Sequence, residues 1–260
     1  MTRPAPEEIK SCCATAYQND AVALLLGDSR HPGGRRLTRR LADALGLAPR
    51  ERVLDVAAGT GGTALLLARE YGVEADGVDL GEASVAKAAA TAAAAGAGGT
   101  VRFHAGDAER LPFDDATFDA VVCECAFCTF PDKPTAAAEI ARVLRPGGRA
   151  GITDITVTGP LDERLAGLAG WVACIADARS ADDYTAVLDG AGLRVTRSER
   201  HDDALITMID MIEARLRGFK IIRPSAFTGI DLGTALQMTA LARAAATRGD
   251  AGYVLMAAQK

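Results

Sequence analysis

Six cysteines have the most distinctive chemistry in this sequence, and they fall into three separated segments. They are Cys12 and Cys13 near the N-terminus, Cys123, Cys125 and Cys128 in the middle of the chain, and Cys174 further on. Thiolates are the ligands that soft, thiophilic centres prefer. If the fold brings the three segments together, the sequence predicts a site that holds such a centre.

Other interpretations of these thiols stay open. A free cysteine is often a small buried hydrophobic residue, and Cys123 suits that interpretation because it lies within an apolar run. A zinc site is less well supported, because adjacent cysteines and a single Cys125-x-x-Cys128 do not form the usual paired knuckles. Cys125 and Cys128 also have the spacing of a redox motif, although such motifs favour a helix N-terminus.

Acidic residues and glycines form a second chemical set. The apolar run 53–56 contains Asp55 and leads into Ala57, Gly59 and Gly61, after which leucines and alanines recur at helical spacing. This order is typical of a buried strand, a glycine turn that lets a ligand approach closely, and a helix whose free N–H groups suit a polar ligand. A tight strand-to-helix connection without a ligand needs the same glycines, so this signal alone is not specific.

Two further predicted strands end in carboxylates. One ends in Asp79, followed by Leu80, and the other ends in Asp107, followed by Ala108. In a βαβ unit the first of these acids can accept the ribose hydroxyls of a nucleoside. The second can meet an adenine amino group. The three strand ends together predict one nucleoside site.

Together these motifs resemble the class I S-adenosylmethionine-dependent methyltransferases. The resemblance spans about residues 53–154 and is carried by Asp55…Gly59-Thr-Gly61, Asp79, Gly106-Asp107-Ala-Glu109-Arg-Leu-Pro-Phe113 and Val143-Leu-Arg-Pro-Gly-Gly148. It implies that the glycine loop packs on the methionine part of the cofactor, Asp79 binds the ribose, and Asp107 with Ala108 binds the adenine. The expected cofactor contacts are Asp55, Ala57, Gly59, Gly61, Asp79, Leu80, Asp107, Ala108 and, from a lid, Tyr17. Ala57 departs from the usual glycine.

The order of the strands and helices that must position these residues predicts an α/β fold with a Rossmann-like seven-stranded methyltransferase sheet. Residues 1–48 are expected to form an N-terminal helical lid, and residues 49–260 the methyltransferase domain with a helical insertion at about 204–248 before the last strand. We expect the last strand, 252–258, to lie antiparallel between the fifth and sixth strands. Residues 1–8 are expected to be disordered, because they are rich in proline and glutamate. Residues 161–178 are expected to form a helix that carries Trp171 and Cys174.

The sequence is also similar to the arsenite methyltransferases. Ser11-Cys12-Cys13, Cys125-x5-Pro131-Asp132-Lys133 and Trp171-x2-Cys174 carry this narrower resemblance. It implies that Cys125 and Cys174 bind trivalent arsenic as thiolates. Two positions depart from the family, since Ala64 replaces a common cysteine and Glu124 replaces a common asparagine. Cys12 or Cys13 is therefore expected to supply the third thiol, with Cys128 in reserve.

The predicted function is methyl transfer from S-adenosylmethionine to arsenite or a methylarsenical held by cysteine thiolates. An external thiol reductant, thioredoxin or glutathione, is expected to return the electrons that arsenic gives up. The alternative is a C- or O-methyltransferase that acts on a small metabolite, with Glu124, His31 or Tyr17 as the proton acceptor. A third class is a thiol protein that sequesters arsenite without turnover.

Composition is compatible with these functions. The chain has 260 residues, 49% of them hydrophobic, which is enough for one large α/β domain with a core. A net charge of −5 argues against a nucleic-acid surface. No apolar stretch approaches about twenty residues and no signal core precedes the first predicted helix, so a cytoplasmic protein without a membrane partner is expected. Its cysteines are then expected to be reduced.

Overall fold

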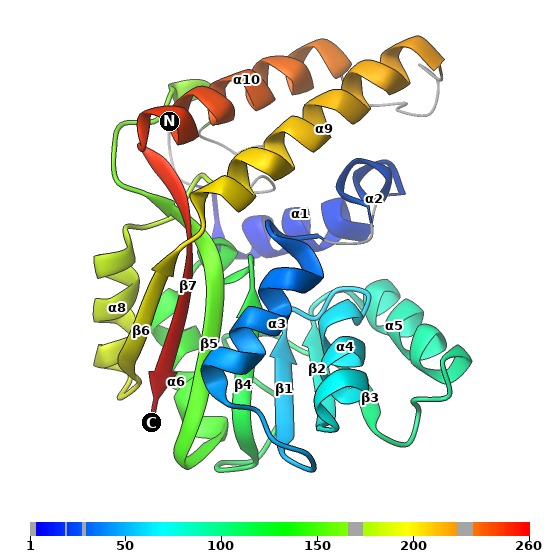
Figure 1. Ribbon diagram of the computed structural model, residues 1–260, viewed down its shortest axis with the longest axis vertical. Coiled ribbons are helices and arrows are strands. Elements are labelled where there is room, and N and C mark those ends of the chain that lie inside the picture. The colour runs from blue at the N-terminus through cyan, green and yellow to red at the C-terminus, as the bar shows by residue number, and fades with distance from the viewer. Residues whose placement is uncertain (1–3, 19, 28–29, 166–173, 223–230) are drawn as a thin grey trace.

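The central strand β1 (Arg52–Val56) is buried over almost its whole length, as expected of a strand covered on both faces of a parallel sheet. The computed structural model describes residues 4–18, 20–27, 30–165, 174–222 and 231–260 (Figure 1). The other strands of the sheet are β2 (Glu74–Asp79), β3 (Val101–Ala105), β4 (Phe118–Glu124), β5 (Leu144–Val157), β6 (Arg194–Arg200) and β7 (Ala251–Gln259). Their order is β3-β2-β1-β4-β5-β7-β6.

The predicted seven-stranded sheet is confirmed, including the direction of its last strand. β7 pairs antiparallel with β5 on one side and with β6 on the other, whereas β1 to β5 run parallel. The carboxyl ends of β1, β2, β3 and β4 therefore meet at one edge. Ligands of open α/β sheets bind beyond that edge, so the fold brings Asp55, Asp79 and Glu124 to one place.

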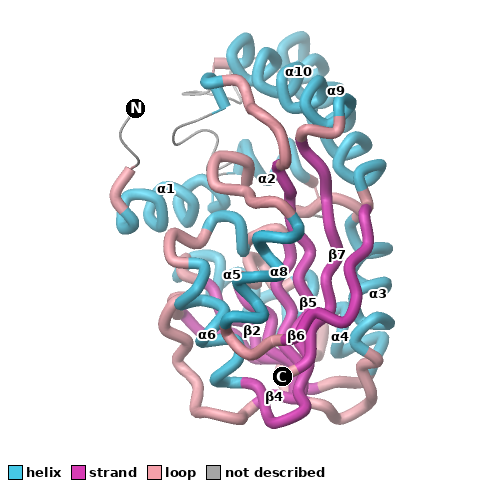
Figure 2. Tube along the Cα trace, turned by 90° about the vertical axis from the view of Figure 1, so that its left-hand side faces the viewer, coloured by secondary structure: helices cyan, strands magenta, loops and turns pink. Residues whose placement is uncertain are grey.

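Helices cover both faces of the sheet. They are α3 (Gly34–Leu45), α4 (Gly62–Tyr71), α5 (Glu82–Ala94), α6 (Lys133–Val143) and α8 (Ala181–Gly190). Figure 2 shows α3 and α4 on one side of the sheet and α6 and α8 on the other. A capping box between Ser180 and Asp183 starts α8. The apolar face of α3 is buried, and it packs so closely that a Cβ at Gly151 of β5 would touch Leu41 and Leu45.

Two helical pairs stand above the carboxyl edge of the sheet (Figure 1). The first is α1 (Pro6–Gln18) with α2 (Asp20–Leu26), and the second is α9 (Asp202–Ile222) with α10 (Leu232–Arg248). Arg215 of α9 donates to the carbonyl oxygen of Leu25 in α2 at 2.7 Å. The predicted insertion therefore braces the N-terminal helices that cover the site.

Two expectations about local structure are wrong. The N-terminal segment is ordered earlier than its composition indicates, because α1 begins at Pro6 and buries Ile9 completely. The helix expected over 161–178 is not continuous: a short 3-10 turn covers Glu163–Leu165, and residues 174–178 form turns. Cys174 has a left-handed backbone with φ of 59°, which ends any helix there. Trp171 lies outside the described residues.

Within the described ranges, no helix combines the length and apolarity needed to cross a bilayer. All six cysteines are free thiols.

Candidate active site

A cavity of about 1430 Å³, part of it open to solvent, lies at the carboxyl edge of the sheet beneath α1. Eight of the nine predicted cofactor contacts line it, namely Asp55, Ala57, Gly59, Asp79, Leu80, Asp107, Ala108 and Tyr17. The ninth, Gly61, does not.

The glycine loop between β1 and α4 explains why Gly61 is absent from the lining. Gly61 has φ of 82°, and a Cβ there would overlap the ring of Phe103. Gly59 is also left-handed, with φ of 54°, and nothing lies within 4 Å of where its Cβ would be. Gly59 therefore leaves room for a ligand, whereas Gly61 lets the loop pack on β3. Ala57 holds a left-handed φ of 59° that usually requires glycine.

Two carboxylates hold this loop in place. Asp55 accepts a hydrogen bond from the backbone N–H of Ala64 at 3.2 Å, which fastens the first turn of α4 to β1. Burial, with a further contribution from nearby Glu124, raises the pKa of Asp55 well above its usual value. Asp79 accepts the backbone N–H groups of Gly59 and Gly81, both at 2.8 Å. Burial raises the pKa of Asp79 although these N–H donors oppose the shift.

Lys10 of α1 joins the lid to the third carboxylate. Its ammonium lies 2.7 Å from Asp107 and also pairs with Glu109. Burial lowers the pKa of Lys10, but the hydrogen bonds to these two carboxylates outweigh it and the net shift is upward. Sequence patterns did not single out Lys10, because a lysine on a short N-terminal helix usually faces solvent.

The thiols of Cys125, Cys128 and Cys174 converge into what we call the thiol cluster. The thiol of Cys174 donates to the backbone carbonyl oxygen of Cys125 at 3.4 Å, and its sulfur also lies 3.2 Å from the hydroxyl of Tyr17. Hydrogen bonds from Cys125, Cys128 and Tyr17 lower the pKa of Cys174 well below its usual value. The pKa of Cys125 is raised by its hydrogen bond to Cys174 and by burial, and that of Cys128 chiefly by burial.

Two residues of the thiol cluster have strained backbones, and a buried lysine joins the segments that carry them. Cys125 and Cys174 both have left-handed backbones, with φ of 55° and 59°, which non-glycine residues rarely adopt. Lys133, only 4% exposed, donates to the carbonyl oxygen of Cys128 at 2.8 Å and to the carboxylate of Asp177 at 2.6 Å. This lysine ties the segment after β4 to the segment that carries Cys174.

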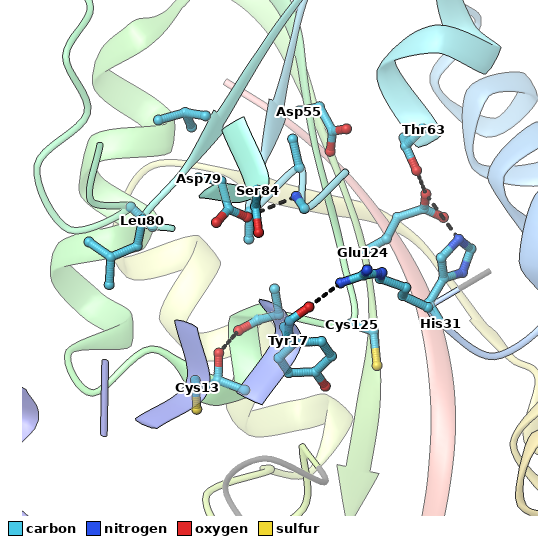
Figure 3. Close-up of a pocket in the computed structure, with 18 of the residues that line it drawn as sticks. Cys13, Tyr17, His31, Asp55, Thr63, Asp79, Leu80, Ser84, Glu124 and Cys125 are labelled. Carbon is cyan, nitrogen blue, oxygen red and sulfur yellow. Dashed lines mark hydrogen bonds and ion pairs between the residues drawn. The ribbon is translucent and has the colours of Figure 1, made fainter. Parts of the chain in front are cut away.

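The cysteines differ in access to the cavity. Cys13 and Cys125 line it, and in the view of Figure 3 they stand on either side of Tyr17. Cys174 is 4% exposed and does not line it, although Tyr17, which does, contacts its sulfur. Burial raises the pKa of Cys13 to about 12. Cys12 does not line the cavity, and Cys128 is buried.

Two of the other interpretations of the thiols can be compared with this geometry. Cys123 is completely buried within β4, as expected of a hydrophobic packing residue. Among the described residues, no three cysteine, histidine, aspartate or glutamate side chains are arranged to hold a metal ion. This geometry gives no support to a zinc site.

A polar cluster lies beside the cavity at the end of β4. The Glu124 carboxylate accepts hydrogen bonds from the hydroxyls of Thr38 and Thr63, and His31 lies 3.5 Å from it (Figure 3). All four residues line the cavity. His31 is only 11% exposed rather than the surface imidazole that a loop position indicates.

Comparisons with known proteins agree with this architecture. Residues 53–148 match a family described as a methyltransferase domain. The chain is 32% identical to the 27-O-demethylrifamycin SV methyltransferase of Amycolatopsis mediterranei, over 100% of this chain and 99% of the relative. The chain belongs to the class I S-adenosylmethionine-dependent methyltransferases. A putative sarcosine dimethylglycine methyltransferase from Galdieria sulphuraria shares the fold, with a TM-score of 0.79 and 23% identity over 87% of this chain and 85% of that chain.

Other methyltransferase relatives match only part of their own length. Methyltransferase GfsG of Streptomyces halstedii is 34% identical over 62% of this chain, which spans 59% of that relative. An arsenite methyltransferase of Halobacterium salinarum is 33% identical over 61% of this chain and 41% of its own length.

The residues of the cavity fit the methyl donor of this family. Asp79 lies where it can accept ribose hydroxyls, Asp107 lies at the next strand end for the adenine, and Gly59 leaves open space beside the first turn of α4. When bound, S-adenosylmethionine supplies a methyl group on a positively charged sulfur. Buried carboxylates around the cavity favour such a cation.

Proposed function

We propose that this methyltransferase transfers the methyl group of S-adenosylmethionine to trivalent arsenic held by the thiolates of Cys125 and Cys174. The thiol cluster is the single observation that carries the proposal. Its sulfurs come from the end of β4 and from a segment about fifty residues later, yet the Cys174 thiol donates to the backbone carbonyl oxygen of Cys125 at 3.4 Å. Two thiolates at one point suit a soft acceptor such as arsenite or a methylarsenical.

The chemistry requires alignment rather than a base. The arsenic lone pair attacks the methyl carbon, the carbon–sulfur bond breaks, and its electrons stay on sulfur to give S-adenosylhomocysteine. Good alignment of bound reactants can supply about 7–11 kcal/mol of barrier lowering. Arsenic is formally oxidised from the trivalent to the pentavalent state, so two thiols must return two electrons by forming one disulfide, either within a dithiol or between two thiol molecules. We propose glutathione or thioredoxin for that step, in a reducing compartment such as the cytoplasm.

Loading of arsenic requires the thiols to lose their protons. Cys174 ionises first, because the cluster lowers its pKa, and Cys125 must then give up its proton to the arsenic-bound hydroxide. Binding should therefore strengthen as pH rises. Tyr17 covers Cys174, so its side chain must move aside to admit the acceptor. Cys13 lines the cavity on the same lid helix and is the better placed of the two N-terminal cysteines to supply a third thiolate.

The test is an incubation with arsenite, S-adenosylmethionine and a thiol reductant, followed by separation of the arsenic species. Wild type should form methylated arsenic and an equivalent amount of S-adenosylhomocysteine. Cys125→Ser and Cys174→Ser should each lower the yield at least roughly a hundredfold, because each removes one of the two thiolates proposed to hold the acceptor. Cys123→Ala, which removes a buried thiol outside the cluster, is the matched control and should keep the activity. Full activity of both serine variants would refute the proposal.

A second candidate is O- or C-methyl transfer to a small metabolite, favoured by the full-length match to a 27-O-demethylrifamycin SV methyltransferase. An alcohol or phenol acceptor must lose a proton, for which the cavity offers His31, Glu124 and Tyr17. Burial raises the pKa of Tyr17 well above its usual value, which makes it the least suitable base. Methylation of a phenol that survives replacement of both Cys125 and Cys174 would support this candidate.

A further inference from the structure

Lys133, the first residue of α6, keeps its ammonium group in the interior of the protein. The ammonium donates to the carbonyl oxygens of Cys128 at 2.8 Å and of Phe130 at 3.2 Å. Its third acceptor is the carboxylate of Asp177, at 2.6 Å. An ammonium group has three N–H donors, so these three acceptors can satisfy all of them.

General stabilisation is a weak explanation for this buried lysine. A positive charge in the first turn of a helix opposes the helix dipole, and burial of an ammonium group is costly. Replacement of a buried ion pair by apolar side chains is often neutral or stabilising. The acceptors of Lys133 indicate another role, because all three lie in the two segments that carry the thiol cluster.

Asp177 stands three residues after Cys174, in a segment that forms turns. Cys174 itself has a left-handed backbone, so no helix fixes its position. Its thiol, a weak donor, lies 3.4 Å from the carbonyl oxygen of Cys125. The ion pair of Asp177 with Lys133 joins the same two segments and is the stronger of these two contacts, since both of its groups are charged.

We propose that Lys133 is a positioning residue of the thiol cluster, whose ion pair with Asp177 sets the distance between the sulfurs of Cys125 and Cys174. The role of that distance rests on the proposed function, in which both thiolates bind one arsenic atom. Two thiolates held at a fixed separation present the second sulfur at a higher effective concentration than two thiolates on segments that move independently.

Retention of phenylarsine oxide tests this role. Each protein is loaded with one equivalent and titrated with dithiothreitol, which competes for arsenic, and intact-protein mass spectrometry gives the fraction that keeps the arsenical. Lys133→Met and Asp177→Ala should each lower the dithiothreitol concentration that strips half of the protein roughly tenfold or more. Arg179→Ala removes the exposed ion pair on the other carboxylate oxygen of Asp177, so it is the matched control and should behave as wild type.

A second readout does not involve arsenic. Dibromobimane alkylates thiols through two arms, and peptide mapping separates protein bridged between Cys125 and Cys174 from protein modified on one of them. The ratio of bridged to singly modified protein should fall roughly tenfold in Lys133→Met and Asp177→Ala. An equal ratio in these variants and in wild type would overturn the inference. Because this ratio needs no arsenic, failure of the inference is distinguished from failure of the proposed function.

A purely structural role of Lys133 predicts a different pattern. Loss of general support would weaken binding of S-adenosylhomocysteine together with retention of the arsenical. We expect Lys133→Met to keep its calorimetric dissociation constant for S-adenosylhomocysteine within about twofold of wild type, and parallel loss of both would contradict the positioning role. Asp177→Asn gives a further test if Lys133→Met folds poorly. Its amide keeps an oxygen acceptor without the charge, so its retention should lie between those of Asp177→Ala and wild type, and retention below that of Asp177→Ala would overturn the assignment.

Discussion

The adenosine half and the acceptor half of the cavity are built in different ways. In the adenosine half, carboxylates at strand ends are held by backbone N–H groups close to them in sequence, as Asp79 is by Gly59 and Gly81. In the acceptor half, the Cys174 thiol meets the backbone carbonyl oxygen of Cys125 from a remote segment, under Tyr17 of the lid. The first half needs only a βαβ unit, whereas the second exists only when the whole chain is folded. Changes in one half should therefore leave ligand binding by the other half intact.

The largest expected effect that separates the halves is that of Asp79→Ala. Removal of a charged acceptor for ribose hydroxyls should weaken binding of S-adenosylhomocysteine roughly a hundredfold or more, since each such hydrogen bond contributes about 1.5–3 kcal/mol. Binding of a trivalent phenylarsenical by the thiol cluster should stay within about twofold of wild type. Calorimetry measures the first quantity and intact-protein mass spectrometry the second. Parallel loss of both would show that the halves are not independent.

A smaller effect is expected in the acceptor half for Tyr17→Phe. The phenylalanine keeps the ring over Cys174 but removes one of the hydrogen bonds that lower the pKa of that thiol. The pH profile for alkylation of Cys174 should therefore move to higher pH. At a pH below both pKa values, alkylation should slow about tenfold for each rise of one in the pKa. Peptide mapping after timed alkylation gives the rates. Cys13, with a pKa of about 12, should react slowly in both proteins at neutral pH. An unchanged profile would refute the proposed hydrogen bond.

Lys10→Met tests the contact between the lid helix α1 and the adenosine half of the cavity. Loss of the pairs with Asp107 and Glu109 should loosen α1 and weaken binding of S-adenosylhomocysteine about three- to fivefold, because partly exposed ion pairs contribute up to about 1 kcal/mol. The difference from wild type should shrink at high salt. Calorimetry at two salt concentrations measures both effects. Tighter binding by the variant would mean instead that Lys10 competes with adenine for Asp107.

Ala57→Gly should have the smallest effect. The left-handed φ of 59° at this position costs an L-residue roughly 1–2 kcal/mol, and glycine removes that strain. Glycine also gives the unfolded chain more conformational freedom, which offsets part of the gain in stability. The free energy of unfolding should therefore rise by up to about 1 kcal/mol in denaturant titrations. A decrease would show that the alanine methyl group makes packing contacts that outweigh the strain.

The same contrast explains how much of the fold and of the site could be predicted from the sequence. Strand ends such as Asp79 and Asp107 follow from local apolar runs and glycine turns, and the direction of β7 follows from the resemblance to the family. The partners of Lys10 and the ring of hydrogen bonds around Glu124 join residues far apart in the chain, so no local pattern could indicate them. The left-handed backbone of Cys174 and the ion pair of Asp177 with Lys133 are likewise not readable from a local pattern.

Convergence of Cys125 and Cys174 on one acceptor is tested most directly by phenylarsine oxide, whose arsenic has two exchangeable valences and needs two thiols. Mass spectrometry of the intact protein, followed by peptide mapping under non-reducing conditions, identifies the bridged cysteines. We predict one arsenical per protein, joining the peptides of Cys125 and Cys174, and its loss in Cys174→Ser. An arsenical found on Cys12 and Cys13 alone, or bound equally well by Cys174→Ser, would contradict the thiol cluster as the acceptor site.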